Sequence, residues 1–168
     1  MAALSRALDA VSAAVVALAG AALVGLVAIT GWMVFGRYVL NDTPTWVERA
    51  ATLIVVSISM PVAAVGVRER FHLSVAGFRD ALPPRARAAV LLATDAAVML
   101  FGAAMAWWSW ELVEGSWRFR VPLLGISQGW TYVPLVVGGA LAAAFGAEQV
   151  ARGLMGLDRP QTAAAALE

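Results

Sequence analysis

The sequence predicts an all-α integral membrane protein with four transmembrane helices, and three observations lead to this fold class. Of the 168 residues, 61% are hydrophobic and only 14% are charged, whereas about 25% of residues are charged in an ordinary soluble domain. Four apolar stretches are each close to or above the roughly 20 residues that a helix needs to cross a bilayer. The segments between them are short, so no separate soluble domain is expected.

We place the spans at about residues 10–36, 50–67, 88–110 and 121–147, in a single membrane domain of residues 1–160. The first run is longer than the roughly 7–15-residue apolar core of a secretory signal, so we interpret it as an uncleaved anchor. Residues 161–168 are expected to form a disordered tail. Their Ala-Ala-Ala-Leu-Glu end resembles a vector remnant and is excluded from functional reasoning.

The composition excludes several classes of protein. The 12 basic residues, all arginine, nearly balance 11 acidic residues, so the chain lacks the basic excess that nucleic-acid binding requires. With no cysteine and one histidine, thiol chemistry and the common zinc sites are excluded. The sequence contains neither a recognisable Ser-His-Asp set nor a Gly-rich phosphate loop. We therefore predict no catalytic residues, no metal site, no cofactor and no enzymatic activity.

The distribution of arginine predicts that both termini and the second loop face the cytoplasm. Positive residues are enriched on the cytoplasmic side of membrane proteins. Eight arginines belong to that side and four to the first and third loops: Arg6, Arg68, Arg70, Arg79, Arg85, Arg87, Arg152 and Arg159 against Arg37, Arg49, Arg118 and Arg120. All seven tryptophans lie near the first or third loop. They either anchor the outer face in the lipid interface or mark a face that meets a partner.

The first loop and the start of the second span contain candidate docking residues. Residues 41–44 have the composition of a turn, and Thr45 followed by Glu48 matches a capping box. In one interpretation Glu48 caps the helix and Trp46 is an interfacial anchor. In the other, this acid beside an interfacial tryptophan pairs with an arginine of another subunit.

The second loop predicts a short amphipathic helix on the cytoplasmic surface. Its apolar residues recur at helical spacing, at Phe71, Val75, Phe78 and Leu82. Such a helix lies among lipid headgroups, so membrane lipid is an expected partner. The pair Pro83 and Pro84 ends it. His72 has no neighbouring metal ligand, and we interpret it as a structural or interface residue rather than a proton carrier.

Asp95 is the one acidic residue inside a predicted span, and an intramembrane carboxylate by default suggests an ion or proton site. No second acid or base lies within another predicted span to complete a relay. We therefore favour a buried packing residue or a contact to another protein's helix. The alternative function is an autonomous four-helix channel or exporter, which would need a polar stripe down one helix, and only Asp95 offers a start. A haem-bearing anchor would need intramembrane histidines, and the predicted spans contain none.

Five motifs follow one another along the four spans, and each lies near the end of a span. They are Phe35-Gly36-Arg37-Tyr38, Pro44-x-Trp46-x-Glu48, the run 68–75 (Arg-Glu-Arg-Phe-His-Leu-Ser-Val), Leu82-Pro83-Pro84 and Gly129-Trp130-x-Tyr132-x-Pro134. In these motifs and their order, the chain resembles the small membrane subunit, or Q subunit, of tripartite ATP-independent periplasmic (TRAP) transporters. The resemblance extends from about residue 7 to residue 157.

The resemblance implies a noncatalytic small permease subunit in the bacterial inner membrane, without substrate-binding residues of its own. The subunit would scaffold a large multi-helix membrane subunit and help to dock a periplasmic substrate-binding protein. Transport would be secondary and sodium-coupled, for organic acids such as C4-dicarboxylates or sialic acid. Arg37, Tyr38, Trp46 and Glu48 are then expected at an outer interface, and Arg70 and His72 at the cytoplasmic side. Asp95 matches none of these motifs.

Overall fold

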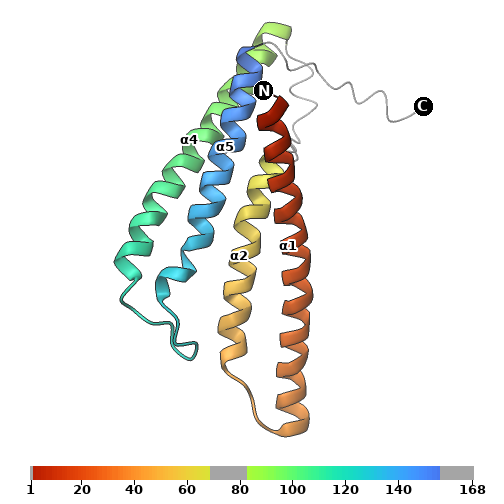
Figure 1. Cartoon of the computed structure of the whole chain (residues 1–168), viewed down its shortest axis with the longest axis vertical. Coiled ribbons are helices and arrows are strands. Elements are labelled where there is room, and N and C mark those ends of the chain that lie inside the picture. Colours follow the sequence, from red (N-terminus) through yellow and green to blue (C-terminus); the bar gives the residue numbers. More distant parts are fainter. Residues whose placement is uncertain (1, 69–82, 156–168) are drawn as a thin grey trace, which may run out of the picture.

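The described residues, 2–68 and 83–155 of the computed structural model, form long antiparallel helices without a β-strand among them (Figure 1). The main helices are α1 (Ala2–Phe35), α2 (Trp46–Arg68), α4 (Pro84–Ser116) and α5 (Val133–Leu154). A π-helical turn, η1 (Gly36–Leu40), follows α1, and a 3-10 turn, η2 (Gln128–Thr131), precedes α5. Four helical segments are long and apolar enough to cross a membrane, which confirms the predicted fold class.

Helix α5 lies between α2 and α4 and packs against both, whereas α1 packs mainly against α2 (Figure 1). Accordingly, 44% of the most apolar window of α5 is buried, against 0% for α1. Buried apolar residues occur at both ends of the bundle, with Val47 and Val113 near the α1–α2 and α4–α5 loops. A hydrophobic core cluster lies near the end where α1 begins and α5 ends. This core contains Ala64, Val65, Ala142 and Phe145, with Leu8 and Val15 of α1 packed against it.

Two consecutive glycines of α5 allow its neighbours to approach closely on two sides. A Cβ atom on Gly138 would lie 2.9 Å from backbone atoms of Met60 in α2, and one on Gly139 would lie 2.7 Å from the backbone nitrogen of Ala106 in α4. Successive helical residues point about 100° apart, so one glycine faces each partner. Small residues allow such close packing between membrane helices.

The first three helices are longer than the predicted spans because the prediction stopped at the first charged residue. Helix α2, for example, begins at Trp46 rather than residue 50 and includes Glu48 and Arg49 in its first turn. Both charged side chains are exposed. A helix continues past the apolar core of a membrane when charged side chains near its ends reach the aqueous boundary.

The predicted start of the fourth span at residue 121 is wrong. Residues 121–127 form a loop, and regular helix begins only at η2 and then α5. Pro122 cannot donate a backbone hydrogen bond, while Leu123 and Gly125 have φ angles of 72° and 68°. These left-handed conformations interrupt a helix even though the segment is apolar.

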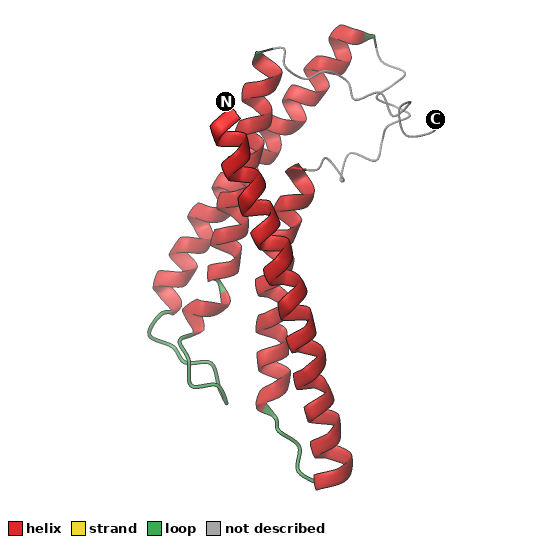
Figure 2. Ribbon diagram, turned by 45° about the vertical axis from the view of Figure 1, so that its right-hand side comes forward, coloured by secondary structure: helices red, strands yellow, loops and turns green. Residues whose placement is uncertain are grey.

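The predicted amphipathic helix, Arg70, His72 and the tail 161–168 lie outside the described residues. Within the described part, the α1–α2 loop and the α4–α5 loop lie at one end of the bundle, and the first turns of α1 lie toward the other end (Figures 1 and 2). This arrangement places the first and third loops together.

Candidate functional site

The first candidate site is the α1–α2 loop, whose shape depends on Gly36. The amide of Asp42 donates to the carbonyl of Gly36 at 3.0 Å, and Asn41 takes a left-handed conformation with φ 56°. A Cβ atom on Gly36 would lie 2.8 Å from the carbonyl oxygen of Asp42 and 3.1 Å from Cδ of Pro44. Glycine at this position therefore permits the turn that brings the chain back into α2.

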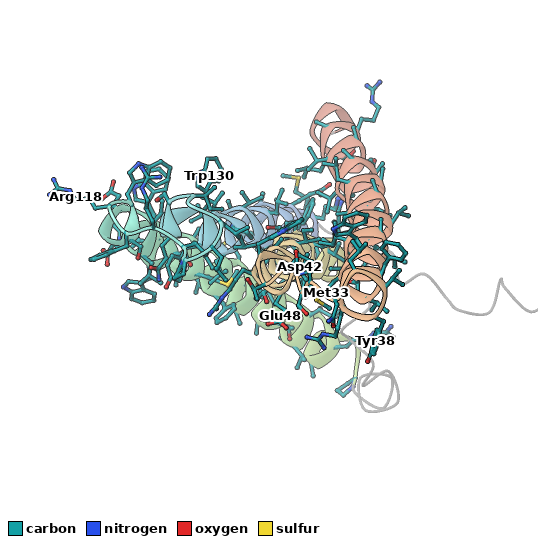
Figure 3. The ribbon with its side chains drawn as sticks, turned by 90° about the horizontal axis from the view of Figure 1, so that it is seen from below. Met33, Tyr38, Asp42, Glu48, Arg118 and Trp130 are labelled. Carbon is teal, nitrogen blue, oxygen red and sulfur yellow. The ribbon has the colours of Figure 1, made fainter. Side chains whose placement is uncertain are left out.

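The four outer candidates flank this turn. Tyr38 is 79% exposed and Trp46 42% exposed, and the side chains of Arg37 and Glu48 are also exposed. Figure 3 looks onto this end of the molecule and shows Tyr38 pointing away from the helices. The charged groups of Arg37 and Glu48 make neither an ion pair nor a hydrogen bond with any described residue. The structure therefore gathers these residues at one end of the bundle. The charged groups of Arg37 and Glu48 are left available for a partner outside the described residues.

The capping box predicted from Thr45 and Glu48 is wrong. Neither side chain makes a hydrogen bond within residues 2–68 and 83–155. The amide of Val47 instead donates to the carbonyl of Pro44 at 3.1 Å, so the backbone itself closes this turn. Glu48 remains in the first turn of α2, where a carboxylate interacts favourably with the positive end of the helix dipole.

All seven tryptophans are partly open to the surroundings, with exposed fractions between 42% and 72%. Trp117 and Trp130 meet at the α4–α5 loop, with ring centroids 6.0 Å apart and planes inclined by 42°. On α4, the indole nitrogen of Trp110 donates to the carboxylate of Glu114 at 2.8 Å. The tryptophans thus concentrate toward the end of the bundle that carries the α1–α2 and α4–α5 loops.

Asp95 lies on α4 and is only 4% exposed. It takes part in interactions within the chain. Its burial agrees with a packing residue, which is one of the two roles that we favoured from the sequence, and its contribution to function stays a prediction.

A second cluster, which we did not predict, lies near the opposite end of the bundle around Arg68 at the end of α2. The Arg68 guanidinium forms ion pairs with Asp9 of α1 at 2.7 Å and with Glu148 of α5 at 3.5 Å. It also donates to Oγ of Ser12 and to the carbonyl of Ser5, each at 3.2 Å. One side chain therefore joins α1, α2 and α5, and we call these residues the Arg68 cluster.

The Arg68 cluster is partly buried. The side chain of Glu148 is 5% exposed and that of Arg68 14% exposed, whereas Asp9 is 68% exposed. The guanidinium carbon lies 5.4 Å from the centroid of the Phe145 ring, a distance at which a cation and an aromatic face attract. Arg152 also pairs with Glu148, one turn away on α5. The buried carboxylate thus has two cationic neighbours.

Gln149 completes the connection between α2 and α5. Its side-chain nitrogen donates to the carbonyls of Val67 and Arg68 at 3.1 and 3.2 Å. The last carbonyls of a helix have no partner within the helix, so Gln149 satisfies two of them at the end of α2.

The sequence did contain a signal for the Arg68 cluster, because four membrane passes place Asp9, Arg68 and Glu148 at one side.

The described residues form four antiparallel helices of spanning length. Short loops join α1 to α2 and α4 to α5. This arrangement defines a multi-pass helical membrane protein. The Arg68 cluster connects three of these helices, α1, α2 and α5, to one another.

Residues 26–156 match the family model described as the DctQ component of tripartite ATP-independent periplasmic transporters, and the chain belongs to this family. It is similar to the sialic acid TRAP transporter small permease protein SiaQ of Vibrio cholerae serotype O1, with 28% identity over 117 residues. This alignment covers 70% of the chain and 68% of the relative. The protein is therefore a small permease subunit of a TRAP transporter and a multi-pass protein of the bacterial inner membrane, as the sequence motifs predicted.

Proposed function

We propose that this chain is a noncatalytic scaffold that binds and braces the large membrane subunit of its transporter. Family membership is the observation that carries this proposal. The Arg68 cluster supports it, because a brace requires helices that hold a fixed arrangement, and this cluster ties three helices together. In this account the large subunit carries the substrate and the coupling ion.

We also propose that the transporter takes up an organic acid with sodium. The named relative is a sialic acid transporter subunit, so sialic acid is the first substrate to test and C4-dicarboxylates are the second. Uptake into proteoliposomes that contain both membrane subunits, with the binding protein outside, is expected to require an inward sodium gradient. Equal uptake without sodium would contradict the proposed coupling.

The α1–α2 loop is our proposed docking surface for the periplasmic binding protein or for an outer segment of the large subunit. Its support is the group of exposed side chains at Arg37, Tyr38, Trp46 and Glu48, whose charged members have no described partner. We orient the chain by the excess of arginine at the other side, which predicts that this loop faces the periplasm. We further propose that Arg70 and His72 fix the subunit at the cytoplasmic side.

Single substitutions at this surface test the docking role. Trp46→Ala and Glu48→Ala are expected to lower the initial rate of uptake, or the recovery of the complex, several-fold. Glu111→Ala is the matched control, because Glu111 is an exposed acid near the same end of the bundle but lies on α4. Wild-type uptake and wild-type recovery in both loop variants would overturn the docking proposal while leaving family membership intact.

A further inference from the structure

The loop between α4 and α5 is unusually apolar for a segment outside the helices. Phe119, Leu123 and Ile126 are 63%, 64% and 40% exposed. We call residues 117–128 the α4–α5 hairpin. The α1–α2 loop differs, because its residues 41–45 are Asn, Asp, Thr, Pro and Thr. Water solvates that loop well, whereas it solvates the exposed side chains of the hairpin poorly.

Several backbone N–H and C=O groups of the hairpin form hydrogen bonds with one another. The amide of Val121 donates to the carbonyl of Ile126 at 2.8 Å, and the amide of Gly125 donates back to Val121 at 3.1 Å. At its base, the amide of Gln128 donates to the carbonyl of Phe119 at 2.8 Å.

Side chains satisfy two further carbonyls of the hairpin. The hydroxyl of Ser127 donates to the carbonyl of Trp117 at 2.8 Å, and the guanidinium of Arg120 donates to the carbonyl of Gly125. Irregular backbone is costly in lipid because its polar groups lack water. A loop that supplies its own partners avoids much of this cost.

The position of the hairpin also fits the membrane boundary. Trp117 and Trp130 pack together at its base, and tryptophan is enriched at lipid interfaces. The helical segment that contains the first apolar span continues past Arg37 to Leu40. Figures 1 and 2 show the α1–α2 loop reaching further along the long axis than the hairpin. The hairpin therefore lies closer to the centre of the bundle than the end of this helical segment.

We propose that the α4–α5 hairpin is embedded in the lipid interface of the leaflet at its own end of the bundle. Phe119, Leu123 and Ile126 contact the parts of the acyl chains that lie next to the headgroups. Arg118 is exposed, has no ion pair among the described residues and points away from the helices in Figure 3. It contacts lipid phosphate, as long basic side chains do near membrane boundaries. This inference depends on the membrane location and not on the docking role proposed above.

Site-directed spin labelling tests this contact directly, because the chain contains no cysteine. Single variants Leu123→Cys and Phe119→Cys, in the full chain, would be labelled in nanodiscs of phosphatidylethanolamine and phosphatidylglycerol. Nanodiscs expose both membrane faces, so the orientation of the protein does not matter. Asp42→Cys is the matched control in the polar loop. Phe119 lies outside the left-handed turn at Leu123 and Gly125, so it reports even if labelling disturbs that turn.

Collision rates with oxygen, which concentrates in lipid, and with a water-soluble nickel chelate distinguish the outcomes. Labels at Leu123 and Phe119 are expected to collide with oxygen several-fold more than with the chelate, and the label at Asp42 is expected to show the reverse. A label at Arg118→Cys is expected to give an intermediate ratio. Chelate collisions at Leu123 and Phe119 equal to those at Asp42 would overturn the proposal. Protection from both reagents would also overturn it, because it would indicate a covering protein.

Discussion

At the scale of single residues, Glu148 and Asp9 make ion pairs of different value with the same arginine. The side chain of Glu148 is 5% exposed, whereas that of Asp9 is 68% exposed. Removing one partner of a buried pair leaves an uncompensated buried charge, while an exposed pair is weakened by solvent. The Arg68 cluster therefore depends mainly on its buried carboxylate.

We predict that Glu148→Gln lowers the free energy of unfolding by about 3 kcal/mol, as expected when a buried pair loses one member. Asp9→Asn is the matched control and is expected to cost no more than about 1 kcal/mol. Thermal unfolding in mild detergent, followed by tryptophan fluorescence, measures both. Equal losses in the two variants would show that burial does not govern the cluster.

Asp95 provides a second test at this scale. If it packs within the structure, Asp95→Asn is expected to retain sodium-dependent uptake close to the wild-type rate, because asparagine has a similar shape and can hydrogen-bond. Uptake into proteoliposomes and recovery of the assembled complex are measured together. Loss of uptake in a complex that still assembles would identify Asp95 as a functional intramembrane acid.

At the scale of helices, the close approach of α2 and α5 depends on Gly138. A Cβ atom there would lie 2.9 Å from the backbone of Met60, and this backbone cannot move aside without shifting α2. We predict that Gly138→Ala destabilises the protein by about 1–3 kcal/mol, the usual cost of overpacking. Thermal unfolding measures this effect.

Gly20→Ala is the matched control, because a Cβ atom on Gly20 in α1 would meet nothing within 4 Å. It is expected to leave stability unchanged or to raise it slightly, since alanine favours a helix more than glycine does. A destabilisation of similar size in both variants would contradict the account of α5 packing.

Helices and loops also differ in how well the sequence predicts them. The membrane helices follow from long apolar runs, so their existence and order could be predicted. Residues 121–127 of the α4–α5 hairpin are as free of charge as a span, but Pro122 and the left-handed residues Leu123 and Gly125 keep them out of helix α5. A count of charged residues does not detect such local backbone conformation.

The Arg68 cluster was harder to predict, for a different reason. Asp9 and Glu148 lie far from Arg68 and from each other in the sequence. Their pairing with Arg68 depends on how three helices pack. From the sequence, Arg68 marked the end of a span, counted toward the cytoplasmic arginines and opened the motif 68–75, but no ion-pair partner was indicated for it. Because an even number of spans separates Asp9, Arg68 and Glu148, the sequence predicts that all three lie at one side of the membrane. A specific ion pair, however, requires distances that a sequence does not contain.

At the scale of the whole molecule, α1 has the least internal support among the four long helices that the structure describes. It packs mainly on α2, and 0% of its most apolar window is buried. The first half of α1 is attached to the bundle by the packing of Leu8 and Val15 and by the Arg68 cluster. Much of the surface of α1 therefore faces lipid or another subunit, which agrees with a protein that belongs to a larger complex.

The central claim is that this subunit acts in a complex with a large membrane subunit. Purification of the chain from its native membrane in mild detergent, followed by identification of the proteins that accompany it, tests this claim most directly. We predict recovery with a large multi-helix membrane protein of the same transporter. Recovery as a self-oligomer that transports solute on its own would contradict the account and would favour an autonomous channel or exporter.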